Sequence, residues 1–283
     1  MLPGPTIFRR CPQCGVQLKQ WSYASDNAFG ARYWTDGRCL GPMLSDTSPL
    51  AKCPRCGHVL WLADAEEIDR IDHFYLSHLR GIDTEHESVS LWSCEFDARP
   101  LWKRALGIGQ PEIVTRLRCI PPPVSKEMKE EVARRRPVLE QFLARAEELR
   151  RTSLEPEQPQ EQDYLEYAAR PALDPTRERW ARTWAWWCAN DVIRDGTADA
   201  QGFPLSGAQS DNLHRLSNLL DGATDVDRIT QAEIARELGR FDDALSLLTG
   251  AYSDAVLGSV ETIRSLCHEQ NRGVAEIPQR VGW

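Results

Sequence analysis

Two copies of one short cysteine motif constrain this chain more than any other part of its sequence. The first reads Cys-Pro-Gln-Cys-Gly over residues 11–15, and the second reads Cys-Pro-Arg-Cys-Gly over residues 53–57. A tight turn can point both sulfurs of such a motif inward, because proline presets φ and glycine permits a left-handed residue. Four thiolates suit a tetrahedral structural Zn²⁺. The spacing therefore predicts a zinc ribbon with one structural Zn²⁺, whose ligands are Cys11, Cys14, Cys53 and Cys56.

Other potential ligands lie close to these motifs in the sequence. Cys39 lies between the two cysteine pairs and His58 directly follows the second motif, so the spacing leaves open whether either lies near the zinc. His73, His78 and His86 are also clustered, but a helical metal pair needs a spacing of three or four residues. We expect no second metal site from these histidines.

The short motifs typical of enzymes are absent from the sequence. It contains no Gly-x-Ser-x-Gly, no phosphate loop, no His-Glu-x-x-His and no Gly-x-Gly-x-x-Gly. A catalytic zinc keeps an open coordination position, which four cysteine ligands would close. We therefore expect a protein that is not an enzyme; an enzyme would need an unrecognised site within residues 66–160.

Composition indicates a globular protein of a reducing compartment. The hydrophobic fraction is 41% and the charged fraction is 27%, as in ordinary soluble domains. No apolar run is long enough to cross a membrane, and the N-terminal residues lack the apolar segment of a secretory signal. Cysteines in zinc spacing fit a compartment in which thiols stay reduced. We expect a cytoplasmic protein with no membrane association.

The 283 residues suggest about two domains and a connector. We expect a zinc ribbon at 1–65, a mixed connector with helices at 66–159 and a helical, repeat-like domain at 160–283. This is an α+β fold in which a small β ribbon precedes a mainly α-helical, tetratricopeptide-like domain. Because a ribbon of this size has little core, zinc binding, worth about 10–16 kcal/mol in small zinc domains, should decide whether it folds.

Within the ribbon, the pattern predicts short strands. Residues 31–35 and 38–40 flank Asp36-Gly37, which indicates a hairpin with a two-residue turn whose central residues both have positive φ. Residues 59–62 form a further short apolar strand. From Asp64 onward, apolar residues recur at intervals of three and four, which predicts a helix through Leu79.

The connector and the C-terminal half read mainly as helices. Short strands are expected at 89–93 and 112–119, then a helix from Ser125 that Pro137 must kink or restart. Residues 152–162 are polar and aperiodic, and are the best linker candidate. Further helices are expected at 177–194, 210–220, 229–238, 241–251 and 253–270.

Two helical patterns suggest function, and each has a plainer interpretation. Residues 232–251 resemble one tetratricopeptide repeat, with small residues at the helix contacts, Gly239 at the turn and Phe241 in the gap. The alternative is an ordinary helical hairpin.

Trp180, Trp184 and Trp187 share one helical stripe and are expected in the core. Trp186 falls off that stripe and is the candidate for an exposed interaction residue.

Charge is distributed unevenly along the chain. The formal net charge is −8, which disfavours nucleic-acid binding by the protein as a whole. Residues 1–60, however, hold seven cations and three carboxylates, a net charge of +4, with four aromatic residues interleaved (Trp21, Tyr23, Tyr33 and Trp34). These rings could stack on bases beside Arg32 and Arg38. Nucleic-acid binding through the ribbon is thus the alternative function.

If the ribbon has a working face, we expect it on residues 27–36, with Asn27, Phe29, Arg32, Trp34 and Asp36 as candidate interaction residues.

A resemblance covers both ends of the chain. Residues 25–31 (Ser-Asp-Asn-Ala-Phe-Gly-Ala), 34–37 (Trp-Thr-Asp-Gly), 53–56 and 61–65 (Trp-Leu-Ala-Asp-Ala) resemble the N-terminus of a group of uncharacterised bacterial proteins. In that group a split zinc ribbon precedes a tetratricopeptide-like helical half. Residues 163–166, 186–191 and 232–244 look like counterparts in that half. The resemblance implies this architecture and a bacterial origin, but no mechanism.

Together these features predict a non-enzymatic protein-interaction or adaptor protein with a structural zinc ribbon. Stacked helical hairpins present extended surfaces, so we expect protein partners on the helical half. Nucleic-acid binding through the ribbon is the alternative, and an enzyme comes third.

Overall fold

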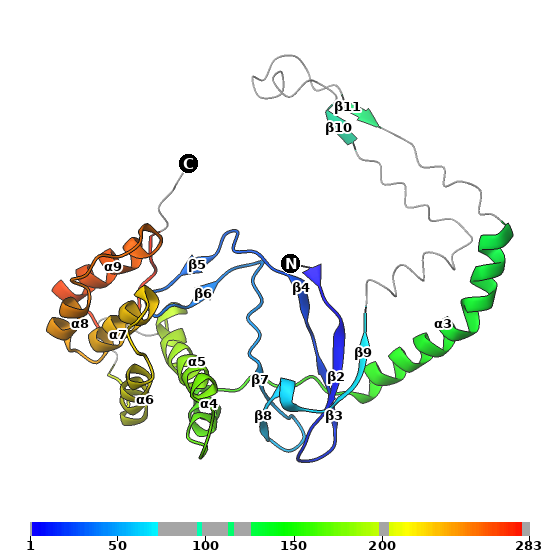
Figure 1. The fold of residues 1–283 in the computed structure, drawn as a ribbon, viewed down its shortest axis with the longest axis horizontal. Coiled ribbons are helices and arrows are strands. Elements are labelled where there is room, and N and C mark those ends of the chain that lie inside the picture. The colour runs from blue at the N-terminus through cyan, green and yellow to red at the C-terminus, as the bar shows by residue number, and fades with distance from the viewer. Residues whose placement is uncertain (1, 73–94, 98–112, 116–125, 198–203, 279–283) are drawn as a thin grey trace. The chain divides into compact units, whose positions relative to one another are not determined.

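The computed structural model describes residues 2–72, 95–97, 113–115, 126–197 and 204–278. Small antiparallel sheets occupy the N-terminal part and helices the C-terminal half, so the predicted α+β class is confirmed (Figure 1). The chain divides into two compact units, one of residues 1–70 with 153–283 and the other of residues 71–152. The ribbon and the C-terminal helices, which we expected as separate domains, fall in the same unit; the three-part division itself stays a prediction.

Two β-hairpins carry the cysteine motifs. In the first, β2 (Thr6–Arg10) pairs antiparallel with β3 (Gln17–Gln20), and in the second, β7 (Leu50–Lys52) pairs antiparallel with β8 (Val59–Trp61). Each motif lies in the loop that joins the two strands of its hairpin and begins directly after the first of them. The predicted strand at 59–62 is therefore confirmed.

A third strand extends the first hairpin where a helix was expected. After the short 3₁₀ turn η1 (Leu62–Asp64), β9 (Glu67–Ile71) joins a sheet with the strand order β3-β2-β9. The predicted helix from Asp64 is wrong over these residues, because backbone pairing with β2 outweighs the helical spacing of the apolar residues. Its remaining residues, 73–79, lie outside the described part of the chain.

The insert between the cysteine pairs contains the predicted hairpin, but with a different turn. β5 (Arg32–Tyr33) pairs antiparallel with β6 (Cys39–Leu40). Trp34 N donates to Arg38 O and Gly37 N donates to Trp34 O. Gly37 has a φ of +79° whereas Asp36 stays out of the positive region, so the loop has three residues and one left-handed glycine. Upstream, β1 (Leu2–Pro3) pairs with β4 (Tyr23–Ser25).

The expected linker is bound along both cysteine hairpins; we call residues 153–160 the strap. Leu154 N donates to Gln17 O at 2.9 Å, and Lys19 N donates to Leu154 O at 2.8 Å. Glu157 and Lys52 exchange both of their backbone hydrogen bonds, each at 2.9 Å. The strap lacks an apolar period because it is held through its backbone, so the predicted linker at 152–162 is bound to the hairpins through Leu154 and Glu157.

Six α-helices follow the strap in the described residues, and several of them begin with a side-chain cap. They are α4 (Glu161–Ala168), α5 (Pro175–Arg194), α6 (Gly207–Asn218), α7 (Asp225–Glu237), α8 (Phe241–Leu247) and α9 (Leu257–His268), the last preceded by a 3₁₀ turn, η2 (Asp254–Val256). Asp174 caps α5 by accepting from two backbone amides, with Pro175 in the first turn. Ser206 and Gln209 form a capping box on α6.

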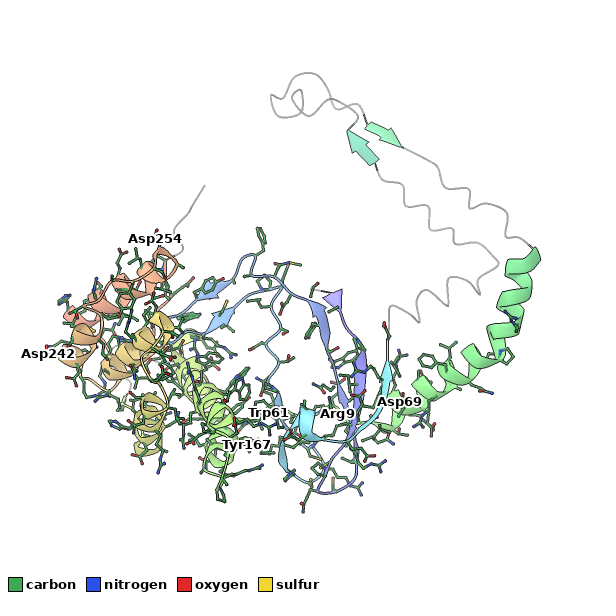
Figure 2. All side chains as sticks on the ribbon, in the orientation of Figure 1. Arg9, Trp61, Asp69, Tyr167, Asp242 and Asp254 are labelled. Carbon is green, nitrogen blue, oxygen red and sulfur yellow. The ribbon has the colours of Figure 1, made fainter. Side chains whose placement is uncertain are left out.

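Helix α5 is buried on two opposite sides. Its expected stripe packs with α4 and with the ribbon: Trp180 lies 5.1 Å from Trp61 of β8, centroid to centroid, and Trp184 stacks on Tyr164 at 5.7 Å. Trp61 also lies beside Tyr167 of α4 (Figure 2). The other side carries Trp186, which is 2% exposed and packs among Leu213 and Leu216 of α6 and Ile234 of α7. The expectation that Trp186 is exposed is wrong, because α5 lies between two layers.

The C-terminal helices form their own core. Residues from α7, α8 and α9 make it up: Ile229, Ala232, Ala235, Ala244, Leu248, Val260, Ile263 and Cys267. Gly239 turns the chain between α7 and α8 with a φ of +78°. The alanines let the helices approach closely, as the sequence pattern required.

A segment near the end of the chain returns to the ribbon; we call residues 274–278 the tail. Thr35 N donates to Ala275 O at 2.9 Å and Ile277 N donates to Tyr33 O at 2.7 Å. Arg32 and Glu276 form a salt bridge at 2.6 Å. The tail therefore forms an isolated antiparallel bridge, between Glu276 and Trp34, with the segment that follows β5.

The second unit is described only in part. β10 (Glu95–Asp97) pairs antiparallel with β11 (Ile113–Thr115), which lies within the strand predicted at 112–119. Helix α3 (Lys126–Thr152) runs through Pro137 without restarting. The strand expected at 89–93 and the histidines at 73, 78 and 86 lie outside the described residues. None of the helices described is long and apolar enough to span a bilayer.

Candidate metal centre

The two hairpin loops bring the four predicted cysteines together. All four sulfur atoms lie within 4.8 Å of one another. The Cys11 and Cys56 sulfurs are 3.8 Å apart, and the Cys14 and Cys53 sulfurs are 3.7 Å apart. Zn–S bonds of about 2.3 Å place tetrahedral sulfurs about 3.8 Å apart, whereas a disulfide needs about 2.0 Å. The tetrad thus has the spacing of a four-coordinate metal site.

The two cysteine loops have the same backbone hydrogen bonds. Gly15 N donates to Cys11 O at 2.9 Å, and Gly57 N donates to Cys53 O at 2.8 Å. The two glycines have φ values of +73° and +70°, so each motif uses its glycine as the sequence required. The backbone N–H that follows the first glycine, on Val16, lowers the pKa of the Cys14 thiol to about 7.

The site is buried on one side and open on the other. Cys11 and Cys53 are 1% and 0% exposed and pack on Leu18, Leu60 and Ala65. Cys14 is half-buried and Cys56 is exposed. Among the described residues the ligand cluster contains only the four cysteines, so the side chains of Cys39 and His58 are not part of it.

The donor set defines what this site can do. Four thiolates in a tetrahedron suit Zn²⁺ or iron and leave no coordination position for a substrate or an activated water. The hairpins contribute two sulfurs each, so a bound ion would join them. The arrangement fits a metal that holds the fold together.

The candidate interaction residues of the insert divide into exposed and buried groups. Phe29 is 82% exposed, and the backbone around it is fixed, since Phe29 N donates to Asn27 Oδ1 at 3.0 Å. Asn27 is exposed, as is Arg32. Trp34 and Asp36 are 7% and 4% exposed, so neither side chain projects into solvent. The tail and α5 cover them.

A buried polar network connects Asp36 to the helices, and sequence reasoning missed it. The Asp36 carboxylate accepts from Asn190 Nδ2 at 3.0 Å and pairs with the Arg194 guanidinium. The Asp36 carbonyl accepts from Trp187 Nε1 at 3.0 Å. Asn190 Nδ2 also donates to Glu237 Oε1, at 3.1 Å. These contacts tie the turn of the ribbon hairpin to α5 and α7.

Glu237 lies at the centre of this network. Its Oε2 accepts from Trp186 Nε1 at 2.7 Å, which satisfies the buried indole. Burial, followed by the nearby charge of Glu233, raises the pKa of the Glu237 carboxyl to about 8. Glu233 itself pairs with Arg236, and both side chains are fully buried. The Glu237 carboxyl is therefore mostly protonated at neutral pH.

The structure also neutralises most cations of the basic ribbon. Six of its seven lysines and arginines lie within 4 Å of a carboxylate, in the pairs Arg9–Glu67, Arg10–Glu66, Lys19–Glu155, Arg32–Glu276, Arg38–Asp46 and Lys52–Asp163. All but one of these carboxylates come from outside residues 1–60. Arg38 is also buried against the rings of Trp184 and Trp187. The positive charge counted in the sequence is thus largely balanced by partners that a local count does not include.

Polar residues inside apolar helix patterns were the available signal for the missed network. Asn190 and Arg194 lie one turn apart in the tryptophan helix, and Glu233, Arg236 and Glu237 follow the alanines of α7.

Comparisons of the chain with protein families, with curated proteins and with solved structures found no match.

Proposed function

We propose that this chain is a non-enzymatic protein-interaction or adaptor protein with a structural Zn²⁺ in its cysteine tetrad. The proposal rests on the positions of the large apolar side chains that are exposed to solvent. Of the eight in the described residues, five belong to the insert between the cysteine pairs: Trp21, Tyr23, Phe29, Tyr33 and Met43. Apolar side chains gathered on one segment typically mark an interaction surface.

The closed metal site supports the same proposal. With four thiolates around it, the ion would stabilise the segment that presents these side chains and would perform no chemistry. The α7–α8 hairpin and its alanine contacts support a tetratricopeptide-like helical half. The resemblance to the bacterial split-ribbon group supports a bacterial origin, and the cysteines in zinc spacing support a reducing compartment such as the cytoplasm.

Nucleic-acid binding has less support from the geometry. The exposed rings Trp21 and Tyr33 would need free cations beside them to bind phosphates. Most cations of the ribbon are already paired, and Arg38 is buried. We therefore keep one proposed function.

The test uses the full chain, because the ribbon and the C-terminal helices share one compact unit. Elemental analysis of the purified protein should give one zinc per chain, and none in Cys14→Ser/Cys53→Ser. A red protein containing iron would overturn the assignment of zinc.

A pull-down from a lysate of the source organism then tests the function. Bait protein should retain specific proteins, and Tyr23→Ser/Phe29→Ser bait should lose them. Leu247→Ser is the matched control, since Leu247 is also exposed but lies on α8. Recovery that disappears after nuclease treatment, or no recovered protein, would contradict the proposal.

A further inference from the structure

A groove lies where the ribbon insert, the helices and the tail meet; we call it the ribbon–helix groove. Its walls include Tyr33 and Trp34 of the insert, Val226 and Ile229 of α7, Asp254 of η2 and Ile277 of the tail. Its volume is about 560 Å³, which is within the usual range of ligand-binding clefts. Segments more than 200 residues apart in the sequence thus build one concave surface.

The rim of the groove exposes apolar surface to solvent. Val226 is 59% exposed and Tyr33 is 41% exposed. Phe29, the most exposed of the large apolar residues described, directly follows the lining residue Ala28. Covering these side chains would remove apolar surface from water, which favours association.

One wall of the groove already consists of extended chain. The tail pairs with β5 through Ala275 and Ile277, on either side of the Trp34–Glu276 bridge. In an antiparallel ladder this alternation directs the backbone N–H and C=O of Glu276 away from β5. Neither group has a backbone partner among the described residues. At Glu276 the tail therefore offers one backbone N–H and one C=O with which an added extended peptide can pair.

The charge of the groove is negative. Among the residues that the structure describes, Asp254, at the start of η2, is the only charged member of the lining, and it is exposed (Figure 2). No lysine or arginine of the described chain forms an ion pair with it. Arg32, which directly precedes the lining residue Tyr33, is already paired with Glu276. A partner therefore gains by placing a cation beside Asp254.

We propose that the ribbon–helix groove binds an extended peptide segment of a partner protein, in which large apolar side chains stand next to a lysine or arginine. The apolar side chains cover Val226 and Tyr33, the backbone adds to the edge of the tail, and the cation faces Asp254. This inference rests on the proposed function and specifies the surface and the kind of partner.

Fluorescence polarisation with the zinc-loaded full chain tests the inference. The probes are two labelled peptides of about eight residues, both with alternating valine and phenylalanine, one with lysine at each end and one with glutamate. The lysine peptide should bind with saturation and weaken as salt is raised, while the glutamate peptide should bind about tenfold more weakly or not at all.

Variants locate the binding. Val226→Asp should lower the affinity of the protein for the lysine peptide about tenfold. This variant should fold, because Val226 is exposed and aspartate is favourable in the first turn of a helix. Asp254→Asn should reduce the preference for lysine over glutamate, and Leu247→Ser should change neither affinity.

Three outcomes would overturn the inference: no binding of the lysine peptide, equal binding of both peptides, or binding that Val226→Asp leaves unchanged. A dimer in light scattering that Val226→Asp dissociates would assign the groove to a second copy of the chain. If the pull-down partners survive Val226→Asp but are lost with Tyr23→Ser/Phe29→Ser, the inference fails while the proposed function stands.

Discussion

Glu237 shows how a single buried acid is accommodated at the junction of ribbon and helices. The groups that face it are Asp36 from the ribbon turn, Trp186 and Asn190 from α5, and Glu233 and Arg236 from α7, while Arg272 donates to its backbone carbonyl. The carboxyl groups of Asp36, Glu233 and Glu237 thus lie close together, and all three residues are buried. A buried excess negative charge is costly, so one carboxyl holds a proton.

The pH dependence of stability should reveal this proton. Since the pKa of Glu237 is raised to about 8, the native protein holds a proton that the unfolded chain releases near its ordinary pKa of 4.5. The resulting stability is complete below the unfolded pKa and is lost as pH rises through about 8. We expect the free energy of unfolding, measured by urea denaturation, to fall between about pH 4.5 and 8 and to level off above that.

The variant Glu237→Gln should remove most of that slope, whatever its effect on absolute stability. Asp242→Asn, at an exposed position of α8, is the control and should keep the slope. Equal slopes in Glu237→Gln and the unaltered protein would show that another group carries the proton.

At the scale of single elements, the strap is the segment whose role differs most from its appearance in the sequence. It is polar and aperiodic, yet its backbone pairs with a strand of each cysteine hairpin. The strap's contribution to the free energy of unfolding should therefore depend on its backbone amide groups more than on its side chains.

Leu154→Pro tests this role. Proline removes the N–H that bonds Gln17 O, leaving that carbonyl without its partner, so unfolding should become easier by about 1–3 kcal/mol. Leu154→Ala keeps the amide and trims a side chain that is 40% exposed, so it should cost about 1 kcal/mol or less. Chemical denaturation of the zinc-loaded chain measures both. A loss in Leu154→Ala as large as in Leu154→Pro would assign the strap's contribution to its side chain.

What the sequence could predict follows from the range over which each interaction acts. The cysteine loops are local, five-residue patterns, and the stripe of Trp180, Trp184 and Trp187 is one helix repeat, so both were predictable. The pair Asp36–Arg194 spans 158 positions and the tail pairs across more than 200, with no periodic pattern to indicate either. The expected exposure of Trp186 failed for the same reason, since one helix alone does not show that a second layer covers it.

At the scale of the whole molecule, the ribbon and the C-terminal helices should behave as one cooperative body. The aromatic contacts of Trp61, the network around Asp36, the strap and the tail all lie between them. A zinc ribbon that folded independently would leave the helices unchanged when the metal is removed.

Asp36→Ala tests the coupling. It removes the carboxylate that Asn190 and Arg194 share and leaves Arg194 paired with Asp191 alone, which should cost about 1–3 kcal/mol. The thermal melting of the helices, followed by far-ultraviolet circular dichroism, and the release of zinc, followed with a chromogenic chelator, should shift downward together. Asp26→Ala, at an exposed position of the same insert, should shift neither. A change in zinc release alone would mean that the two parts unfold separately.

The order in which the first unit is assembled from the chain has a consequence during synthesis. Residues 71–152 separate the cysteine hairpins from the strap that joins them. At translation rates of about 5–20 residues per second, these residues delay the strap by about 4–16 seconds. A nascent ribbon can therefore collect its metal well before the segments that cover Trp34 and Asp36 leave the ribosome. The metal would bind first and the helices would dock last. A shortage of zinc during translation would therefore leave Trp34 and Asp36 in an unfolded segment before the helices and the tail are available to cover them.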